Sequence, residues 1–170
     1  MQPEEQRSGQ QRYTIIPRTL VFLTRDKMLL LLKGAPDKRL WAGQYNGLGG
    51  HIEAGETPYR AAVREVQEEA CLEVDNLTLR AIIHITMPEP PGIMLFAFIG
   101  TAPEGSPRAS NEGTPVWVSL DQYRTLPLVE DLQDLLPRIL EPGPCIFGEY
   151  HFSEAGLVTH FEAGETTQQD

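Results

Sequence analysis

Apolar residues in this chain are grouped in short runs, and segments rich in glycine, proline and charged residues separate the runs. Runs of strand length that are bounded by turn-forming residues are typical of buried β-strands. They predict strands at residues 18–24, 27–34, 77–86, 93–101 and 114–120, and a closing hairpin formed by residues 147–152 and 157–162. We expect Arg25-Asp26 to turn the chain between the first two strands.

Two further segments have the apolar spacing of helices. In the first, predicted over Pro58–Ala70, Thr57 supplies a hydroxyl at the N-cap and proline occupies the first helical position. Its apolar residues fall on one stripe: Tyr59, Ala62, Val63, Val66 and Ala70. The second helix is predicted over Val129–Leu136, with Pro137 ending or kinking it. Strands mixed with two helices predict one mixed α/β domain over residues 13–162, with disordered polar tails at 1–12 and 163–170.

Composition limits the class of protein. Hydrophobic residues make up 41% of the chain and charged residues 22%, as in ordinary globular domains. No apolar run approaches the ~18 residues of a membrane span, and the N-terminus has no apolar signal region, so we expect no membrane partner. Cys71 and Cys145 cannot form a disulfide framework, and we therefore expect a reducing, cytoplasmic context.

The chain is also acidic, with a formal net charge of -10 and a sequence pI of about 4.8. This charge argues against a nucleic-acid partner, because a general nucleic-acid surface requires a basic stripe. A small phosphate-bearing ligand remains possible if a divalent cation supplies the positive charge.

Three glutamates crowd the second half of the first helix. Glu65, Glu68 and Glu69 are spaced i, i+3 and i+4, so they share one face, where their like charges repel. Arg64 is the neighbouring cation, and one arginine does not balance three carboxylates. Mg²⁺ or Mn²⁺ would do so, because these hard cations prefer carboxylate oxygens and keep waters that substrate phosphates can replace. The alternative interpretation is a solvated face of glutamates, which are good helix formers.

A glycine-rich loop before this helix favours the first interpretation. Its glycines allow the backbone to approach a ligand closely: Gly47, Gly49, Gly50 and Gly55. Backbone groups of Gly49 and Gly50 could meet a metal or a phosphate. Glu56 lies where a bidentate pair with Arg64 would fix the loop to the helix.

This arrangement resembles the Nudix box, G-x5-E-x7-R-E-U-x-E-E-x-G-U, in which U is a bulky aliphatic residue. The matching residues are Gly50, Glu56 and the run Arg64-Glu65-Val66-Gln67-Glu68-Glu69-Ala70-Cys71-Leu72. Every defined position agrees except one, where Cys71 stands in place of glycine. The resemblance implies the Nudix fold, an α/β/α sandwich with a mixed sheet, and hydrolysis of a nucleoside diphosphate linked to another group.

The resemblance also implies residue roles. Glu65, Glu68 and Glu69, with the carbonyl of Gly49, are expected to bind Mg²⁺ or Mn²⁺, and Arg64 is expected to belong to the catalytic group. Glu112 stands where the family has a distal glutamate that acts as base or metal ligand; a solvated loop glutamate is the alternative.

Cys71 is the departure from the box. A non-glycine residue in the left-handed conformation costs on the order of 1 kcal/mol, so we expect either strain at Cys71 or a different helix end. We expect the thiol to be buried as a small apolar group.

Other segments are similar to the oxidised-purine nucleoside triphosphatases of the MutT kind. That similarity implies that Asn46 hydrogen-bonds the base and that Asp131 reads the purine edge. The backbone of Gly50 could meet a phosphate, and His51 stands where that group often has a lysine, so it is either a weaker phosphate contact or an exposed loop histidine. A second aspartate and a tryptophan of that group are replaced by Leu132 and Val129, although Glu130 could supply a carboxylate. Trp41 and Tyr45 could stack on a base or pack in the core.

The resulting hypothesis is a Mg²⁺-dependent hydrolase that cleaves a nucleoside triphosphate, such as an oxidised purine nucleotide, to monophosphate and pyrophosphate. Its partner is a small nucleotide, and the chain is a monomer or a homodimer. One alternative keeps the chemistry and changes the substrate to a nucleoside diphosphate sugar or a dinucleotide. Another is a non-catalytic nucleotide sensor on the same scaffold.

Overall fold

The computed structural model describes residues 12–37 and 41–164. Apart from Arg12, Ala163 and Gly164, the tails predicted at 1–12 and 163–170 lie outside the described residues. The strands are β1 (Ile15–Arg25), β2 (Met28–Gly34), β3 (Tyr45–Asn46), β4 (Thr78–Thr86), β5 (Gly92–Thr101), β6 (Gly113–Ser119), β7 (Ile146–Ser153) and β8 (Gly156–Ala163). The helices are α1 (Pro58–Ala70), the 3-10 turn η2 (Tyr123–Thr125) and α2 (Leu132–Leu140).

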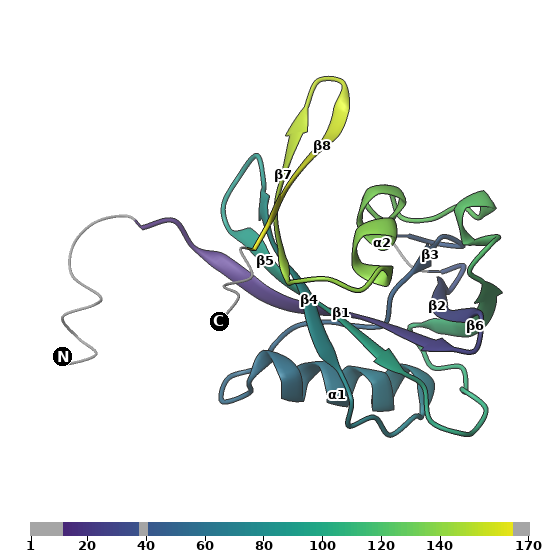
Figure 1. Ribbon diagram of the computed structural model, residues 1–170. Coiled ribbons are helices and arrows are strands. Elements are labelled where there is room, and N and C mark those ends of the chain that lie inside the picture. Colours follow the sequence, from purple (N-terminus) through teal and green to yellow (C-terminus); the bar gives the residue numbers. More distant parts are fainter. Residues whose placement is uncertain (1–11, 38–40, 165–170) are drawn as a thin grey trace, which may run out of the picture.

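The strands form one curved, mixed sheet in the order β3-β2-β1-β5-β4-β7-β8, and β6 also pairs with β2 (Figure 1). β1 runs parallel to β5 and β4 runs parallel to β7, whereas the hairpins β1–β2, β4–β5 and β7–β8 are antiparallel. The mixed sheet with its two helices confirms the predicted α/β class.

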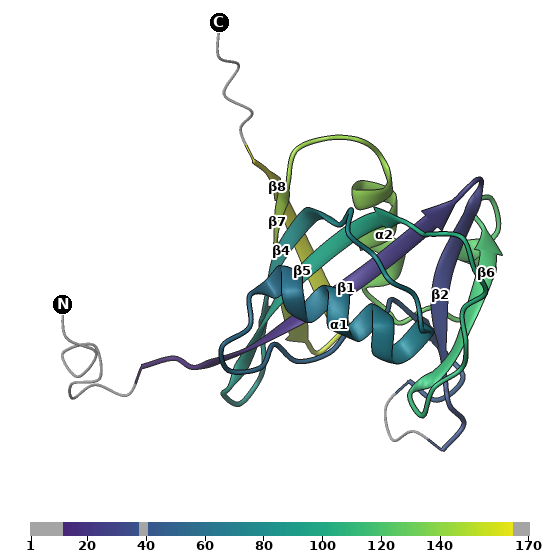
Figure 2. The same cartoon turned by 90° about the horizontal axis from the view of Figure 1, so that it is seen from below.

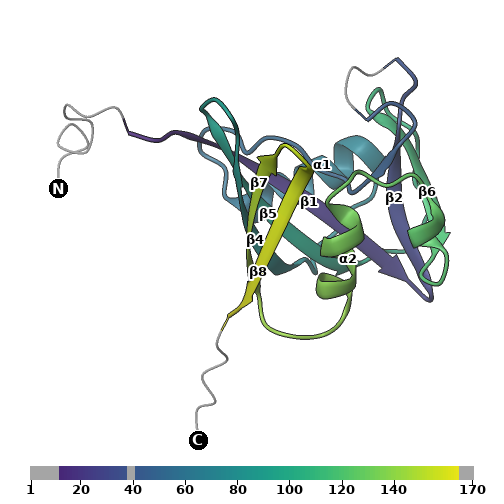
Figure 3. The ribbon, with the colours of Figure 1, turned by 90° about the horizontal axis from the view of Figure 1, so that it is seen from above.

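The two helices cover opposite faces of the sheet. α1 crosses one face over β1, β4 and β5 (Figure 2), and α2 lies against the other face (Figure 3). β1 serves both layers, because its side chains alternate: Leu20 and Phe22 pack in the cluster under α2, and Val21 and Leu23 pack in the cluster under α1. Burial on both faces explains why β1 reads as a continuous apolar run.

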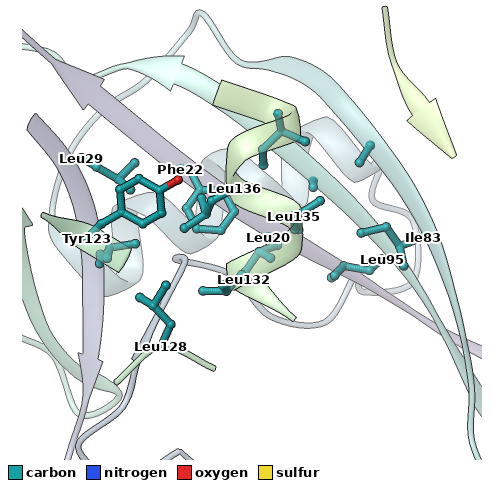
Figure 4. Close-up of a cluster of buried hydrophobic side chains, with 14 of the residues drawn as sticks. Leu20, Phe22, Leu29, Ile83, Leu95, Tyr123, Leu128, Leu132, Leu135 and Leu136 are labelled. Carbon is teal, nitrogen blue, oxygen red and sulfur yellow. The ribbon is translucent and has the colours of Figure 1, made fainter. Parts of the chain in front are cut away.

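The larger cluster is shown in Figure 4. It joins the sheet to the leucines of α2, and its fully buried side chains include Phe22, Leu29, Leu132, Leu135 and Leu136. This packing fixes α2 against β1 and β2.

The edge of β1 is shared between two partners. β2 pairs with β1 only at Leu23–Arg25, and farther along β2 Leu32 and Lys33 pair with β3 instead. The chain between β3 and α1 takes its place, through four backbone hydrogen bonds: Thr19 N to Gly50 O (2.9 Å), Val21 N to Leu48 O (2.6 Å), Leu48 N to Val21 O (3.0 Å) and Ile52 N to Pro17 O (3.1 Å). The glycine-rich loop is therefore held on the central strand of the sheet.

Several predicted boundaries were wrong. The first turn contains Asp26 and Lys27, not Arg25-Asp26, since Arg25 still pairs with Met28. β3 lies inside the stretch that we expected to be irregular.

The second helix begins at Leu132 and ends at Leu140, three residues beyond Pro137, so the proline does not end it. Proline removes one backbone hydrogen bond, and the burial of Leu135, Leu136 and Ile139 offsets that loss.

Within the described ranges, no helix is long and apolar enough to cross a membrane.

Candidate active site

Helix α1 carries the acidic residues, and both of its ends agree with the sequence pattern. At the start, the Thr57 hydroxyl accepts the backbone N–H of Arg60 at 3.2 Å. At the end, Cys71 adopts the left-handed conformation (φ 55°, ψ 36°), and its N–H donates to the Gln67 carbonyl at 3.0 Å. Cys71 therefore takes the backbone conformation that favours glycine. The prediction of a buried thiol was wrong, because Cys71 is exposed.

The three helical glutamates have different environments. Glu65 and Glu69 are buried, with relative exposures of 9% and 5%, whereas the Glu68 side chain is 58% exposed. They differ because Glu65 and Glu69 point at the glycine-rich loop, where the Gly49 N–H donates to Glu69 Oε2 at 2.7 Å.

Glycine is required at two positions of this loop. A Cβ on Gly50 would lie 2.4 Å from Glu65 Oε1, and Gly49 has φ +147° and would place a Cβ 2.2 Å from the Thr19 carbonyl oxygen. The backbone can approach the carboxylates only because both side chains are absent.

Arg64 ties the loop to the helix. Its Nε and Nη2 donate to the two Glu56 oxygens at 2.8 and 3.0 Å, which is the bidentate pair that the sequence predicts. Its Nη1 donates to Glu65 Oε1 at 2.9 Å and Glu68 Oε2 at 3.0 Å, and its Nη2 also donates to the His51 carbonyl at 2.9 Å. The guanidinium is thus fully engaged by protein groups.

The raised pKa of Glu69 shows that a negative charge on this buried carboxylate is not fully compensated. Burial raises the pKa of Glu69 to about 8; the Gly49 N–H opposes this rise, and the charges of Glu65, Glu112 and Glu68 add to it. By contrast, the hydrogen bond from Arg64 lowers the pKa of Glu56. Arg64 therefore stabilises the outer part of the site, and Glu69 is left in a position that favours a bound cation.

Two adjoining cavities open over this helix and loop. The first, the acidic cavity, has a volume of about 510 Å³ and is lined by Glu65, Glu68, Glu69 and Glu112 together with Gly49, Gly50 and His51. The second, the apolar cavity, has a volume of about 300 Å³ and is lined by Leu32, Trp41, Gln44, Asn46 and Gly47. Four residues border both cavities: Arg18, Gly49, Glu69 and Glu112.

The donor set of the acidic cavity fits a hard divalent cation. It offers carboxylate oxygens from three glutamates of one helix and from Glu112, and none of the described residues that line it is a cysteine. Among the described residues no three acidic, histidine or cysteine side chains already converge on one point, because Arg64 and Gly49 hold the carboxylates. Each of Glu65, Glu68 and Glu69 uses one carboxylate oxygen in those bonds, and the second oxygen of each takes no part in them.

The structure brings most of the predicted site residues together. Asn46 lines the apolar cavity, where its Oδ1 accepts the Gly47 N–H at 2.8 Å. His51 is exposed and lines the acidic cavity. Glu130 and Asp131 are not among the described residues that line either cavity; Asp131 lies at the start of α2, where burial raises its pKa to about 6.

Sequence reasoning missed several residues that line the cavities, among them Gln44 and Arg18. Gln44 lines the apolar cavity and Arg18 lines both, and neither belongs to a motif that would have identified it. The structure also separates the two candidate aromatic residues: Trp41 lines the apolar cavity and is 39% exposed, whereas Tyr45 packs against the core under α2.

Comparisons with known proteins agree with this site. The family model of the NUDIX domain matches residues 15–139. The chain is 30% identical over 148 residues to a mouse oxidized purine nucleoside triphosphate hydrolase, covering 86% of this chain and 93% of that protein. It is 36% identical over 126 residues to the NAD-capped RNA hydrolase NudC of Edwardsiella ictaluri, covering 71% of this chain and 46% of that protein.

A solved structure has the same fold. The mutator MutT protein of Bacillus halodurans superposes with a TM-score of 0.76 at 24% identity, covering 87% of this chain and 98% of that one. The box residues, the mixed sheet between two helices and the matched family model lead to one conclusion: this chain belongs to the Nudix hydrolase family.

Proposed function

We propose that this chain is a Mg²⁺-dependent nucleoside triphosphate pyrophosphohydrolase that releases a nucleoside monophosphate and pyrophosphate. The observation that carries the proposal is the junction of the two cavities. An apolar cavity with amide groups suits a nucleoside, and it opens directly into an acidic cavity that suits cation-bound phosphates. The mouse relative, an oxidized purine nucleoside triphosphate hydrolase, supports the choice of substrate class.

The residues have distinct proposed roles. Glu65, Glu68, Glu69 and Glu112, with the Gly49 carbonyl, would hold Mg²⁺ (or Mn²⁺). When bound, this ion supplies charge neutralisation of the phosphates and a more acidic water. Arg64 orients Glu65 and Glu68 through the hydrogen bonds described above.

Glu112 is the proposed base, because it borders both cavities and so reaches the region where the phosphates of a bound nucleotide would lie. It accepts the proton of the water whose oxygen bonds to phosphorus, while the phosphoanhydride bond breaks and pyrophosphate leaves.

The nucleoside would occupy the apolar cavity. Trp41 offers an exposed ring for stacking, and Gln44 and Asn46 offer amides for the base edge. Because Glu130 and Asp131 do not line this cavity, we propose that amide groups, not a pair of carboxylates, read the base. Selection for an oxidised purine then depends on Asn46 and Gln44.

A dinucleotide or a nucleotide linked to a sugar is the second candidate substrate. Two observations favour it: the similarity to NudC, a NAD-capped RNA hydrolase, and the absence of Asp131 from the cavity lining. One turnover panel separates the candidates, with 8-oxo-dGTP, dGTP, dATP, CTP, ADP-ribose and NADH each supplied with Mg²⁺.

We expect one of the triphosphates to give the highest kcat/KM, with monophosphate and pyrophosphate as products. Preferred cleavage of ADP-ribose or NADH would favour the second candidate. Absence of turnover of every compound would favour a nucleotide sensor.

A further inference from the structure

The cavities contain one arginine that the site leaves available. Of the described residues that line them, the arginines are Arg18 and Arg64. Arg64 already donates to Glu56, Glu65, Glu68 and the His51 carbonyl. Glu56, Glu65 and Glu68 form ion pairs with Arg64, and no described residue forms a hydrogen bond or an ion pair with the Arg18 guanidinium. A half-buried guanidinium in this state retains donors for an incoming anion.

The position of Arg18 is fixed by the central strand. Arg18 lies in β1, where it alternates with Thr19 and is paired with Leu95 of β5 on one side and with His51 on the other. The adjacent Thr19 N–H donates to the Gly50 carbonyl at 2.9 Å, so this part of β1 and the loop move as one unit. The strand therefore holds the Arg18 side chain beside both cavities, and no ion pair with a described residue fixes its guanidinium.

Arg18 also lies at the one place where a nucleotide must cross between the cavities. The residues that border both are Arg18, Gly49, Glu69 and Glu112, and Arg18 is the cation among them. A nucleotide with its base in the apolar cavity would carry its first phosphate through this junction. The Glu69 carboxylate would repel that phosphate, and the Arg18 guanidinium offers it a positive partner at this junction.

We infer that Arg18 binds the phosphate nearest the nucleoside, and that it is the direct protein contact that aligns the phosphate chain between the two cavities. The inference rests on the proposed function only in requiring a substrate with a nucleoside and a diphosphate; it does not depend on the base. It differs from a structural role, in which Arg18 would neutralise the helical glutamates, because Glu65 and Glu68 form their ion pairs with Arg64.

The test measures binding separately from turnover. Arg18→Gln removes the charge and keeps a polar side chain, Arg18→Lys keeps the charge, and Arg60→Gln is the matched control, since Arg60 is exposed on α1 and lines neither cavity. Calorimetric titration with Mg²⁺ uses two probes, the non-hydrolysable nucleotide α,β-imido-dGTP and inorganic tripolyphosphate. Thermal unfolding of each variant establishes that it is folded.

We expect Arg18→Gln to weaken the binding of both probes by about 10- to 100-fold, the scale of one charge-assisted hydrogen bond. Arg18→Lys should recover part of that loss, and Arg60→Gln should bind like the wild type. Unchanged affinity of folded Arg18→Gln for both probes would overturn the inference. So would a loss confined to α,β-imido-dGTP, which would assign Arg18 to the nucleoside instead. If Arg18→Gln does not fold, the same comparison is made with Arg18→Met, which also removes the charge and for which unaltered binding together with unaltered KM overturns the inference.

The same variants distinguish this inference from the proposed function. If the wild type cleaves ADP-ribose and no triphosphate, the proposed function fails, but Arg18→Gln should still raise the KM for ADP-ribose by about 10-fold or more. If the wild type cleaves triphosphates and Arg18→Gln has an unchanged KM, the inference about Arg18 fails alone.

Discussion

The burial of Glu69 leads to a prediction about stability. Because its pKa is about 8 in the folded protein and 4.5 for an ordinary glutamate, the folded state binds more protons than the unfolded state between these pH values. Without a divalent cation, stability should therefore fall as the pH rises from about 4.5 to 8. Glu69→Gln should remove this penalty, since an amide is neutral at every pH and its carbonyl can still accept the Gly49 N–H.

The magnitude follows from the two pKa values. At pH 7 the free energy of unfolding should be about 3 kcal/mol lower than it would be with a neutral group, since one pKa unit corresponds to about 1.4 kcal/mol. At pH 5 the same calculation gives about 1 kcal/mol. The buried Asp131, with a pKa of about 6, contributes in the same direction, mainly below pH 6, and remains unchanged in the variant.

The assay is urea unfolding in EDTA at pH 5, 6, 7 and 8. The difference in the free energy of unfolding between Glu69→Gln and the wild type gives the contribution of Glu69. Glu73→Gln is the control for the loss of one negative charge, because Glu73 is exposed. We expect the variant to gain stability over the wild type progressively with pH. Addition of Mg²⁺ at pH 8 should stabilise the wild type more than the variant, because Mg²⁺ favours the ionised carboxylate.

Activity should move in the opposite direction. The same substitution should lower turnover by at least ~100-fold, the scale of losing one electrostatic group in the transition state. Parallel stability curves for wild type and variant across the whole pH range would refute the reasoning about burial. Near-normal turnover would refute the assignment of Glu69 as a cation ligand.

Three further substitutions test the C-terminal end of α1, the glycine-rich loop and the arginine that joins the loop to the helix. Cys71→Gly should raise the free energy of unfolding by about 0.5–1 kcal/mol in urea titrations, because glycine adopts φ 55° without steric strain; a loss of stability would contradict this. Gly50→Ala should place its methyl group against Glu65 and abolish Mg²⁺-dependent turnover, whereas unaltered activity would show that the loop can move away. Arg64→Lys should lower kcat by about 10-fold or more, since lysine cannot form the bidentate pair with Glu56; retention of full kcat would make the charge alone sufficient.

The box and α1 could be predicted from the sequence because local rules decide them. The helix occupies residues 58–70 as predicted, and the bidentate pair of Glu56 with Arg64 forms across eight positions of the chain. The buried thiol predicted for Cys71 was wrong, because the left-handed backbone at a helix end points the side chain toward solvent instead of the core.

Features that depend on tertiary contacts could not be predicted. Arg18 lines both cavities because β2 leaves the edge of β1 and the glycine-rich loop replaces it, and nothing in the local sequence encodes that exchange. The start of α2 was misplaced because Val129 has helical apolar spacing, yet its N–H donates to the Tyr45 carbonyl at 3.0 Å. Glu130 and Asp131 stayed predictions, and the amides that line the apolar cavity are those of Gln44 and Asn46.

The replacement of β2 by the loop at the edge of β1 has a consequence for motion. When a ligand-binding loop is disordered in the free enzyme, part of the binding free energy is used to order that loop in every catalytic cycle. Here the loop shares its backbone hydrogen bonds with the most buried strand, so it can detach only when the sheet itself opens. The amide protons of Val21 and Leu48 should consequently exchange with solvent as slowly as those of the core, and the loop backbone should already be in place when a substrate binds.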